Sequence, residues 1–323
     1  MARTARPPPR AYGGRKPCCR GSRERVGHPT GGETVIEFEG LPESLPDLVD
    51  PVMLCAFEGW NDAGDAASGA ILHLEDVWAA TQIAEFDPED YYDFQVNRPE
   101  IAFDDGVRTV TWPTTRISIA RIPLATRDVV LVHGIEPSMR WRSFTAELLG
   151  AARELGVEMI VTLGALLADT PHTRPVPVSG TSSDSDLALK LGYEPSSYEG
   201  PTGIVGVVQD ACAAAGIPSV SLWAAVPHYV AAPPCPKATL ALLARIEDLL
   251  DVPVPLGDLP EESRAWQIGV DELAGEDDEI QAYVQTLEEA VDTAELPEAS
   301  GDAIAREFER YLRRRASEPP KGP

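Results

Sequence analysis

The 323-residue sequence lacks the features on which most catalytic and membrane assignments rest. It has no uninterrupted apolar run near the roughly 20 residues that a membrane-spanning helix needs. No serine lies in a Gly-x-Ser-x-Gly motif, no cysteine carries a local nucleophile signature, and no His-Glu-x-x-His motif occurs. These absences leave a common hydrolase, a zinc enzyme and a membrane protein unsupported, and we expect neither a metal nor a cofactor.

Cysteine is scarce, and none of it is arranged in Cys-x-x-Cys pairs. The five cysteines are Cys18, Cys19, Cys55, Cys212 and Cys235. Such a set is typical of reduced thiols in the cytoplasm rather than of a disulfide framework or a zinc site. The sequence therefore predicts a cytoplasmic protein.

Positive charge is also scarce outside the first 30 residues. The net charge of the chain is −25, yet residues 1–30 carry seven Arg and one Lys against a single Glu. The strongly acidic remainder repels nucleic acids and anionic membranes, so we expect neither as a partner. Residues 1–32 are rich in Arg, Pro and Gly and predict a disordered basic arm. We favour a start codon assigned too far upstream over a functional arm.

Four apolar runs predict buried strands, and each is followed by polar residues and a helical pattern. The runs are Pro51–Phe57, Asp128–His133, Glu158–Leu163 and Ser219–Ala224. Uniformly apolar strands that alternate with helices indicate a parallel sheet covered on both faces. We therefore expect an α/β domain over residues 33–254, with a mostly parallel sheet flanked by helices.

Residues 86–127 interrupt this alternation with two extended runs around Asp105-Gly106, a dipeptide suited to a hairpin turn. Three prolines punctuate the segment, namely Pro99, Pro113 and Pro123. Because proline is confined to edge strands, the segment predicts an antiparallel insertion at the edge of the sheet.

Residues 255–315 predict an acidic helical extension, and residues 316–323 a disordered tail. Residues 258–302 hold 15 acids and one base, Arg264. Apolar residues recur in steps of three and four at Trp266, Val270, Leu273, Ile280, Val284, Leu287 and Val291, with Asp277 filling the one gap between Leu273 and Ile280. This spacing resembles a heptad seam, but it favours one or two helices that pack on the main domain or on each other. A last helix would carry Ile304, Phe308, Tyr311 and Leu312 on one face.

Polar residues follow all four predicted strands, at the edge where α/β sheets form their binding sites. They are Glu58, Asn61, Asp62, Glu136, Arg140, Arg142, Asp169, His172, Arg174, His228 and Lys237. Such a set could form a cleft for an anion or for acid–base chemistry. Alternatively, the same charges pair with one another or lie in a subunit interface. Both alternatives remain open at this point.

Several blocks in one order resemble the actinobacterial branch of the proteasome assembly chaperone 2 family. The blocks are AFEGWNDAGDAAS, FDPEDYYDFQVNRP, GIEPSMRWRSF, VTLGALLADTPHTRPVPVSGT, YEGPTGIVGVV, LWAAVPHYVAAPPCPKA and ERYLRRR. The resemblance extends from about residue 35 to residue 315 and leaves the basic arm out.

This resemblance implies a nucleoside-phosphorylase-like α/β fold with a C-terminal helical extension and assembly into homo-oligomers, trimers among them. It also implies a chaperone role in proteasome assembly. Eukaryotic relatives dock through a C-terminal hydrophobic–Tyr–any-residue tail, whereas this chain ends in Lys321-Gly322-Pro323. The nearest analogue, Arg310-Tyr311-Leu312, is internal, which favours docking through a face.

The sequence thus leads to two hypotheses. The first is a non-catalytic, cytoplasmic, homo-oligomeric protein that binds other proteins, proteasome subunits among them. The second is a small-molecule binder or enzyme that uses the strand-end cleft for a nucleoside or a phosphate.

Overall fold

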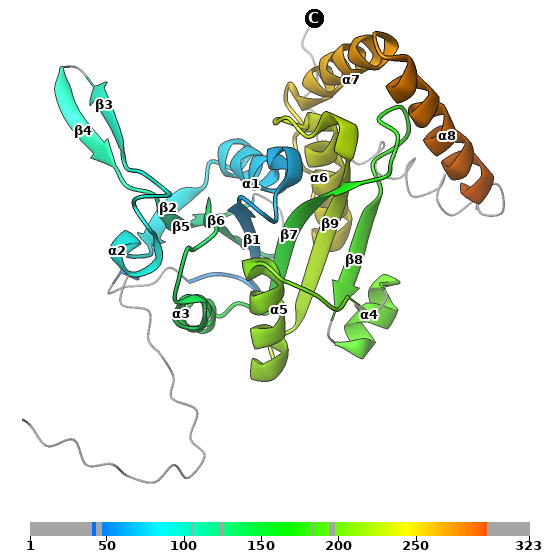
Figure 1. Cartoon of the computed structure of the whole chain (residues 1–323). Coiled ribbons are helices and arrows are strands. Elements are labelled where there is room, and N and C mark those ends of the chain that lie inside the picture. Colours follow the sequence, from blue (N-terminus) through cyan, green and yellow to red (C-terminus); the bar gives the residue numbers. More distant parts are fainter. Residues whose placement is uncertain are drawn as a thin grey trace, which may run out of the picture. The chain divides into compact units, whose positions relative to one another are not determined.

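A seven-stranded mixed sheet forms the centre of the protein (Figure 1), in the order β2-β5-β6-β1-β7-β9-β8. The computed structural model describes residues 41–42, 47–104, 106–122, 126–182, 184–193 and 198–295. The expected basic arm, last helix and C-terminal tail lie outside these residues. The strands are β1 (Val52–Glu58), β2 (Thr81–Glu85), β5 (Thr115–Ala120), β6 (Val129–Ile135), β7 (Met159–Ala168), β8 (Val178–Ser182) and β9 (Ser219–Pro227).

The four predicted strands form the parallel centre of this sheet. Strand β1 pairs in parallel with β6 on one side and with β7 on the other, and β7 pairs in parallel with β9. Residues 52–57 of β1 are all buried, as their continuous apolar run requires of a strand covered on both faces. The predicted fold class, a mostly parallel sheet flanked by helices, is confirmed.

Antiparallel strands close the sheet at both ends. Strand β5 pairs with β6 and then with β2, which confirms antiparallel strands from the inserted segment at the sheet edge. The hairpin around residues 105–106 instead forms a separate ribbon of β3 (Glu100–Asp104) and β4 (Val107–Thr111). Figure 1 shows this ribbon projecting beyond the β2 and β5 side of the sheet.

Strand β8, antiparallel to β9, was not among the predicted strands. Its sequence, VSGTS, is short and polar, and glycine weakens a strand. Here the glycine is needed, because a Cβ atom at Gly180 would lie 2.5 Å from the ring of Tyr193. Tertiary packing therefore specifies this strand.

Helices cover both faces of the sheet. On one face α1 (Ala66–Val77) and α6 (Pro236–Leu250) enclose one apolar cluster. On the other face α3 (Trp141–Glu154) and α5 (Ile204–Ala215) enclose a second cluster. Shorter helical segments are η1 (Ala63–Asp65), α2 (Pro88–Tyr91), α4 (Ser185–Leu191) and η2 (His228–Val230).

Two acidic helices follow the sheet, α7 (Leu259–Gly275) and α8 (Asp278–Glu295). Helix α7 packs along α6, and its residues Leu259 and Trp266 pack against the buried core. Helix α8 contacts α7. The chain leaves the helical path between them, and the Asp277 side chain accepts hydrogen bonds from the first N–H groups of α8. The heptad-like pattern is therefore two helices, one of which packs on the main domain. Among the described residues, no helix is long and apolar enough to cross a membrane.

Candidate functional site

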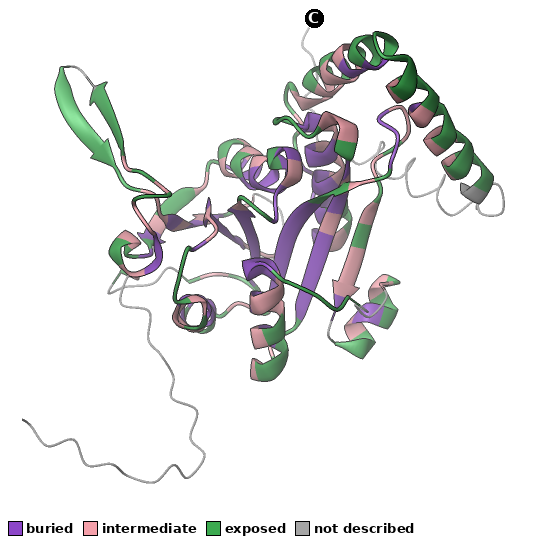
Figure 2. Cartoon of the chain, in the orientation of Figure 1, coloured by how far each residue is buried: buried purple, intermediate pink, exposed green. Residues whose placement is uncertain are grey.

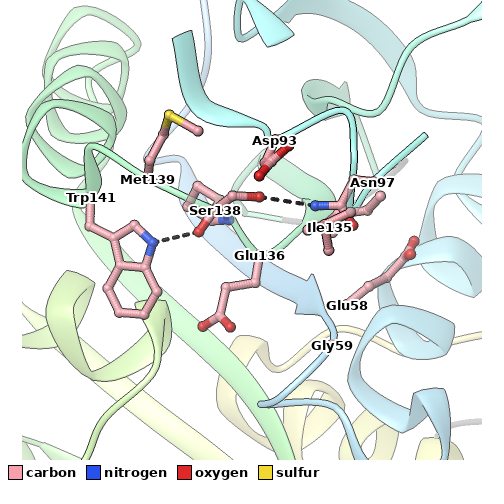
Figure 3. Close-up of a pocket in the computed structure, with 11 residues that line it drawn as sticks. Glu58, Gly59, Asp93, Asn97, Ile135, Glu136, Ser138, Met139 and Trp141 are labelled. Carbon is pink, nitrogen blue, oxygen red and sulfur yellow. Dashed lines mark hydrogen bonds between the residues drawn. The ribbon is translucent and has the colours of Figure 1, made fainter. Parts of the chain in front are cut away.

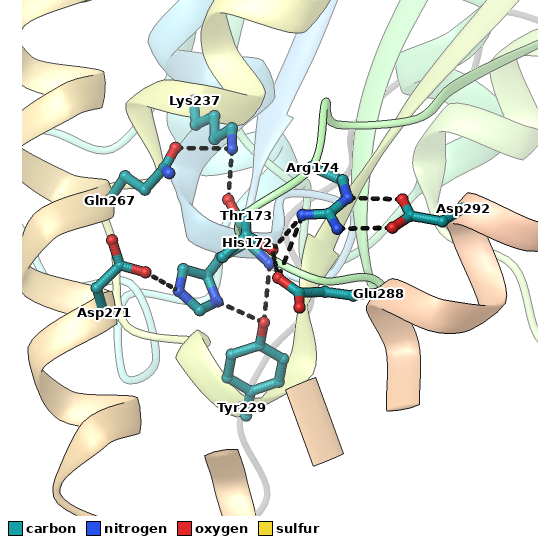
Figure 4. A network of polar contacts seen from close by, with 9 residues as sticks. All are labelled: His172, Thr173, Arg174, Tyr229, Lys237, Gln267, Asp271, Glu288 and Asp292. Carbon is teal, nitrogen blue, oxygen red and sulfur yellow. Dashed lines mark hydrogen bonds and ion pairs between the residues drawn. The ribbon is translucent and has the colours of Figure 1, made fainter. Parts of the chain in front are cut away.

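The predicted strand-end residues fall into two groups in the structure. One group lies beyond β1 and β6, beside a hollow in the surface (Figure 3). The other lies beyond β7 and β9, against helices α7 and α8 (Figure 4).

Glu136 organises the first group. Its Oε1 atom accepts hydrogen bonds from Asn61 Nδ2 at 2.7 Å and from the backbone N–H of Ile204 at 2.8 Å. Ile204 is the first residue of α5, so the carboxylate satisfies an N–H group that the helix leaves unpaired. Asn61 also accepts a backbone hydrogen bond from Ala165, which joins this loop to β7. Glu136 and Asn61 thus hold three elements together.

Asp62 has a comparable role at the next helix. Its two carboxylate oxygens accept hydrogen bonds from the backbone N–H groups of Ala67 at 2.6 Å and Ser68 at 3.1 Å. These groups lie in the first turn of α1, where a negative charge is favourable. Burial raises the pKa of Asp62, and the hydrogen bonds partly oppose that rise. This geometry fits a helix-capping role.

Glu58 lies at the end of β1, next to a buried histidine that sequence reasoning left out of the site. His133 Nε2 is 3.3 Å from Glu58 Oε1, and only 3% of His133 is exposed. This contact lowers the pKa of Glu58, with a smaller contribution from the charge of Arg116. Glu58 is therefore a stable anion at neutral pH.

The hollow beside these residues has a volume of about 490 Å³. It is lined by Glu58, Gly59, Asp93, Val96, Asn97, Ile135, Glu136, Pro137, Ser138, Met139 and Trp141. Three of these residues are carboxylates, and no Lys, Arg or His lies among them. Asn97 donates to Ser138 at 3.1 Å, and the Trp141 indole donates to the Pro137 carbonyl (Figure 3). Asp93 and Asn97 were not among the predicted site residues, because they lie in the inserted segment rather than after a predicted strand.

The two arginines predicted for this edge do not line the hollow. Arg140 forms an ion pair with Asp90, and its guanidinium carbon lies 5.6 Å from the centre of the Tyr91 ring. Arg142 is exposed at the start of α3.

His172 organises the second group, and both of its ring nitrogens are engaged. Nδ1 lies 2.7 Å from the Tyr229 hydroxyl and Nε2 lies 2.8 Å from Asp271 Oδ1 on α7. The His172 backbone N–H also donates to the Tyr229 hydroxyl, at 2.8 Å. Because only 2% of His172 is exposed, these contacts satisfy a buried polar ring and attach α7 to the sheet.

The neighbouring residues attach α8. Arg174 makes two parallel hydrogen bonds with Asp292, each 2.8 Å long, and a third at 3.2 Å with Glu288. Thr173 donates to the same Glu288 carboxylate. The Arg174 guanidinium lowers the pKa of Asp292. The arginine thus binds carboxylates of this chain by the forked geometry it would use for a phosphate.

The remaining predicted residues complete the same contact (Figure 4 shows its central part). Lys237 donates to the His172 carbonyl and, at 3.0 Å, to Gln267 of α7. Asp169 accepts a hydrogen bond from Tyr283 of α8 at 3.0 Å and lies 3.3 Å from His228. The predicted residues Asp169, His172, Arg174, His228 and Lys237, together with the residues of α7 and α8 that they contact, are called the helix anchor below. The acidic residues of α7 and α8 were the sequence signal that could have predicted this contact, because they supply the negative charges that pair with His172 and Arg174.

Neither group, as far as the structure describes it, contains a clustered metal site or a reactive thiol. Within the described part of the chain, no three His, Cys, Asp or Glu side chains are grouped so as to hold a metal ion. Cys55, Cys212 and Cys235 are buried, and burial raises the pKa of each thiol, which makes them poor nucleophiles. The structure therefore defines an α/β protein whose strand-end residues hold its own helices together and surround a small acidic hollow.

The model of the PAC2 family matches residues 56–274, from β1 to the last turn of α7. The chain belongs to the PAC2 family. It is 65% identical to a PAC2 family protein of Streptomyces avermitilis, over 73% of this chain and all of that one, with a TM-score of 0.70.

Two further solved structures are similar. A protein of Mycobacterium tuberculosis described as the proteasome-assembly chaperone homologue Rv2125 is 57% identical over 72% of this chain and 99% of its own, with a TM-score of 0.67. Pyrococcus furiosus PbaB, described as an archaeal proteasome activator, shares the fold at 17% identity and a TM-score of 0.59, over 71% of this chain and 96% of its own. No curated protein matches the chain.

Proposed function

We propose that this protein is a non-catalytic assembly factor that binds proteasome subunits in the cytoplasm as a homo-oligomer. Membership of the PAC2 family and the names of the relatives from Mycobacterium and Pyrococcus support a partner of this kind. The helix anchor carries the proposal. Four residues that could have formed a ligand cleft, His172, Arg174, His228 and Lys237, make hydrogen bonds or close polar contacts within the chain.

Strand-end residues that hold helices α7 and α8 in place, instead of a ligand, suit a protein-binding role. Helices α7 and α8 are rich in Asp and Glu, and Arg264 is the only Lys or Arg in either helix. Figure 2 shows both helices as largely exposed. An acidic surface of this kind steers basic partners and keeps anionic ligands away. Docking through such a face does not need a specific C-terminal tail.

The test of this proposal is association with proteasome α subunits at a defined stage of assembly. A tagged full-length chain is purified from its host with and without a β-subunit deletion that arrests assembly, and the complexes are resolved by native mass spectrometry. We expect α subunits bound to two or more copies of this chain. Absence of α subunits at every stage, together with unchanged proteasome maturation after gene deletion, would contradict the proposal.

The hollow beyond β1 and β6 favours a second candidate, a small-molecule binding protein, because α/β sheets bind ligands at this edge. Its lining argues against the phosphate expected for a phosphorylase-like ligand, since it contains three carboxylates and no cation. A thermal-shift series with nucleosides, sugar phosphates and inorganic phosphate separates the two functions. We expect no change in the unfolding midpoint, and a saturable rise with any of them would favour the second candidate.

A further inference from the structure

The ribbon of β3 and β4 has one face, formed by Ile101, Phe103, Val110 and Arg108, that is apolar except for the arginine and that no described part of the chain covers. Ile101 is 55% exposed, Phe103 73% and Val110 41%. Ile101 pairs with Val110 and Phe103 with Arg108, and residues paired directly across two strands lie on the same face. An isolated two-stranded ribbon is only marginally stable in water, and apolar side chains grouped on its surface mark an interaction site. Figure 2 shows both strands as exposed.

This apolar face continues toward the acidic hollow. Trp112, which follows β4 and is 47% exposed, packs on Phe94 with 4.9 Å between ring centres. Val96, two residues after Phe94, is 74% exposed and lines the hollow. The ribbon and the hollow therefore belong to one surface, which we call the ribbon–hollow surface.

The hollow adds negative charge to this surface. Glu58, Asp93 and Glu136 each have one carboxylate oxygen held by a neighbouring group, as when Asp93 Oδ1 accepts the backbone N–H of Gln95 at 2.8 Å. Within the described residues, the second oxygen of each carboxylate accepts no hydrogen bond. All three side chains are half-buried, so they are partly shielded from the counter-ions of the solvent. The three carboxylates therefore give the lining of the hollow a negative charge that favours a basic group.

We infer that the ribbon–hollow surface binds a segment of a partner protein in which a Lys or Arg stands beside apolar side chains. The apolar residues would cover Ile101, Phe103 and Val110, and the basic group would enter the hollow. Charge complementarity selects this occupant, because the carboxylates of the lining repel phosphates and attract a basic side chain. The inference shares with the proposed function only the premise that the partner is a protein. It does not require that partner to be a proteasome subunit.

The test places the photo-crosslinking residue p-benzoylphenylalanine at position 103 of the full-length chain. Leu189, which is 83% exposed, is the matched control position, because it lies on α4, a helix that contacts β8 at the opposite edge of the sheet. Both chains are irradiated with purified proteasome α subunits and, separately, in cells, and the crosslinked peptides are sequenced by mass spectrometry. We expect position 103 to crosslink a peptide with a Lys or Arg among apolar residues, and position 189 to give no such product.

A charge variant tests the role of the hollow. Glu58→Gln with Asp93→Asn should lower the crosslinking yield at position 103 by about tenfold, as expected when a desolvated charge pair is lost from an interface. Glu272→Gln with Glu276→Gln removes the same charge from exposed positions in the last turn of α7 and directly after it, and should change the yield by less than about twofold. The hollow variant should lower the unfolding midpoint slightly, because it loses the contact between Glu58 and His133, so the yields are compared at a temperature at which both variants are folded.

Equal yields at positions 103 and 189, a crosslink to this same chain, or equal yields from the two charge variants would overturn the inference. If α subunits bind the chain without a crosslink at position 103, the ribbon–hollow surface is not the docking site and the proposed function stands. If α subunits fail to bind while a cellular partner crosslinks with the expected sequence and charge dependence, the inference stands and the proposed function fails.

Discussion

At the scale of single residues, carboxylates at the strand ends act as connectors. Glu136 and Asp62 each accept backbone N–H groups from the first turn of a helix, and Glu58 faces a buried imidazole. Removing a helix-capping side chain costs about 1 kcal/mol of stability, which is a noticeable fraction of the total for an ordinary domain. These side chains therefore explain how the loops beyond β1 and β6 keep their shape.

Glu58 makes stability depend on pH in a defined direction. Its pKa is lowered in the folded protein by His133, below the value of 4.5 expected when the chain is unfolded. The unfolded state therefore binds a proton first as the pH falls below about 4.5, and the folded state loses stability there. We expect Glu58→Gln to flatten this acid-side loss in urea unfolding measured between pH 3 and pH 6. Glu272→Gln on the exposed side of α7 is the control, and an equal flattening by both variants would contradict the assignment.

The sequence predicted the main strands but could not place every polar residue. Continuous apolar runs identified β1, β6, β7 and β9 because burial on both faces leaves a local signature. The partners of His172 and Arg174 carry no such signature, since Asp271 and Asp292 lie 99 and 118 positions further along the chain. The hollow was also missed in part, because Asp93 and Asn97 come from an insertion between two strands. Long-range pairing of this kind is decided by tertiary packing.

At the scale of elements, the helix anchor joins α7 and α8 to the sheet with unequal strength. Helix α7 has buried residues, Val270 and Ala274, and a contact to the buried His172. Helix α8 is held by contacts nearer the surface, among them the ion pair of Arg174 with the half-exposed Asp292, and surface ion pairs add little stability. Helix α8 should therefore detach from the sheet more often than α7 does.

Arg174→Ala should loosen α8 without unfolding the sheet. Loss of the forked contact removes a weak surface interaction, so the unfolding midpoint should change little. Hydrogen–deuterium exchange in residues 278–292 should become faster by several-fold, while exchange in β1 and β7 should stay unchanged. Arg264→Ala, which removes an exposed arginine paired within α7, is the matched control. Unchanged exchange in α8 would show that the arginine does not hold this helix.

At the scale of the whole molecule, the acidic helices differ in how far they belong to the main core. Leu259 and Trp266 pack against the cluster between the sheet and α6, whereas Val284 is the one buried apolar residue among the described residues of α8. The family match also ends at residue 274, within α7. We therefore propose that the boundary between the core and the extension lies after α7 rather than before it.

Two truncations test this boundary. A chain ending at residue 277 should keep most of its stability, because the described residues of α8 are mainly exposed. A chain ending at residue 258 should lose several kcal/mol, since burial of each large apolar side chain contributes about 1.5–3 kcal/mol. Urea unfolding of both chains gives the comparison. Equal losses would show that α7 adds no more to the core than α8 does.

The strand order also has a consequence for synthesis. Strand β1 lies between β6 and β7 in the finished sheet, and Val52 pairs with Val129, 77 positions further on. At a translation rate of about 5–20 residues per second, β1 waits roughly 4–15 seconds for its first neighbour. During that time a strand buried along almost its whole length in the native state is an open apolar edge on the nascent chain. A member of a family that includes assembly-chaperone homologues thus passes through a stage in which it needs protection itself.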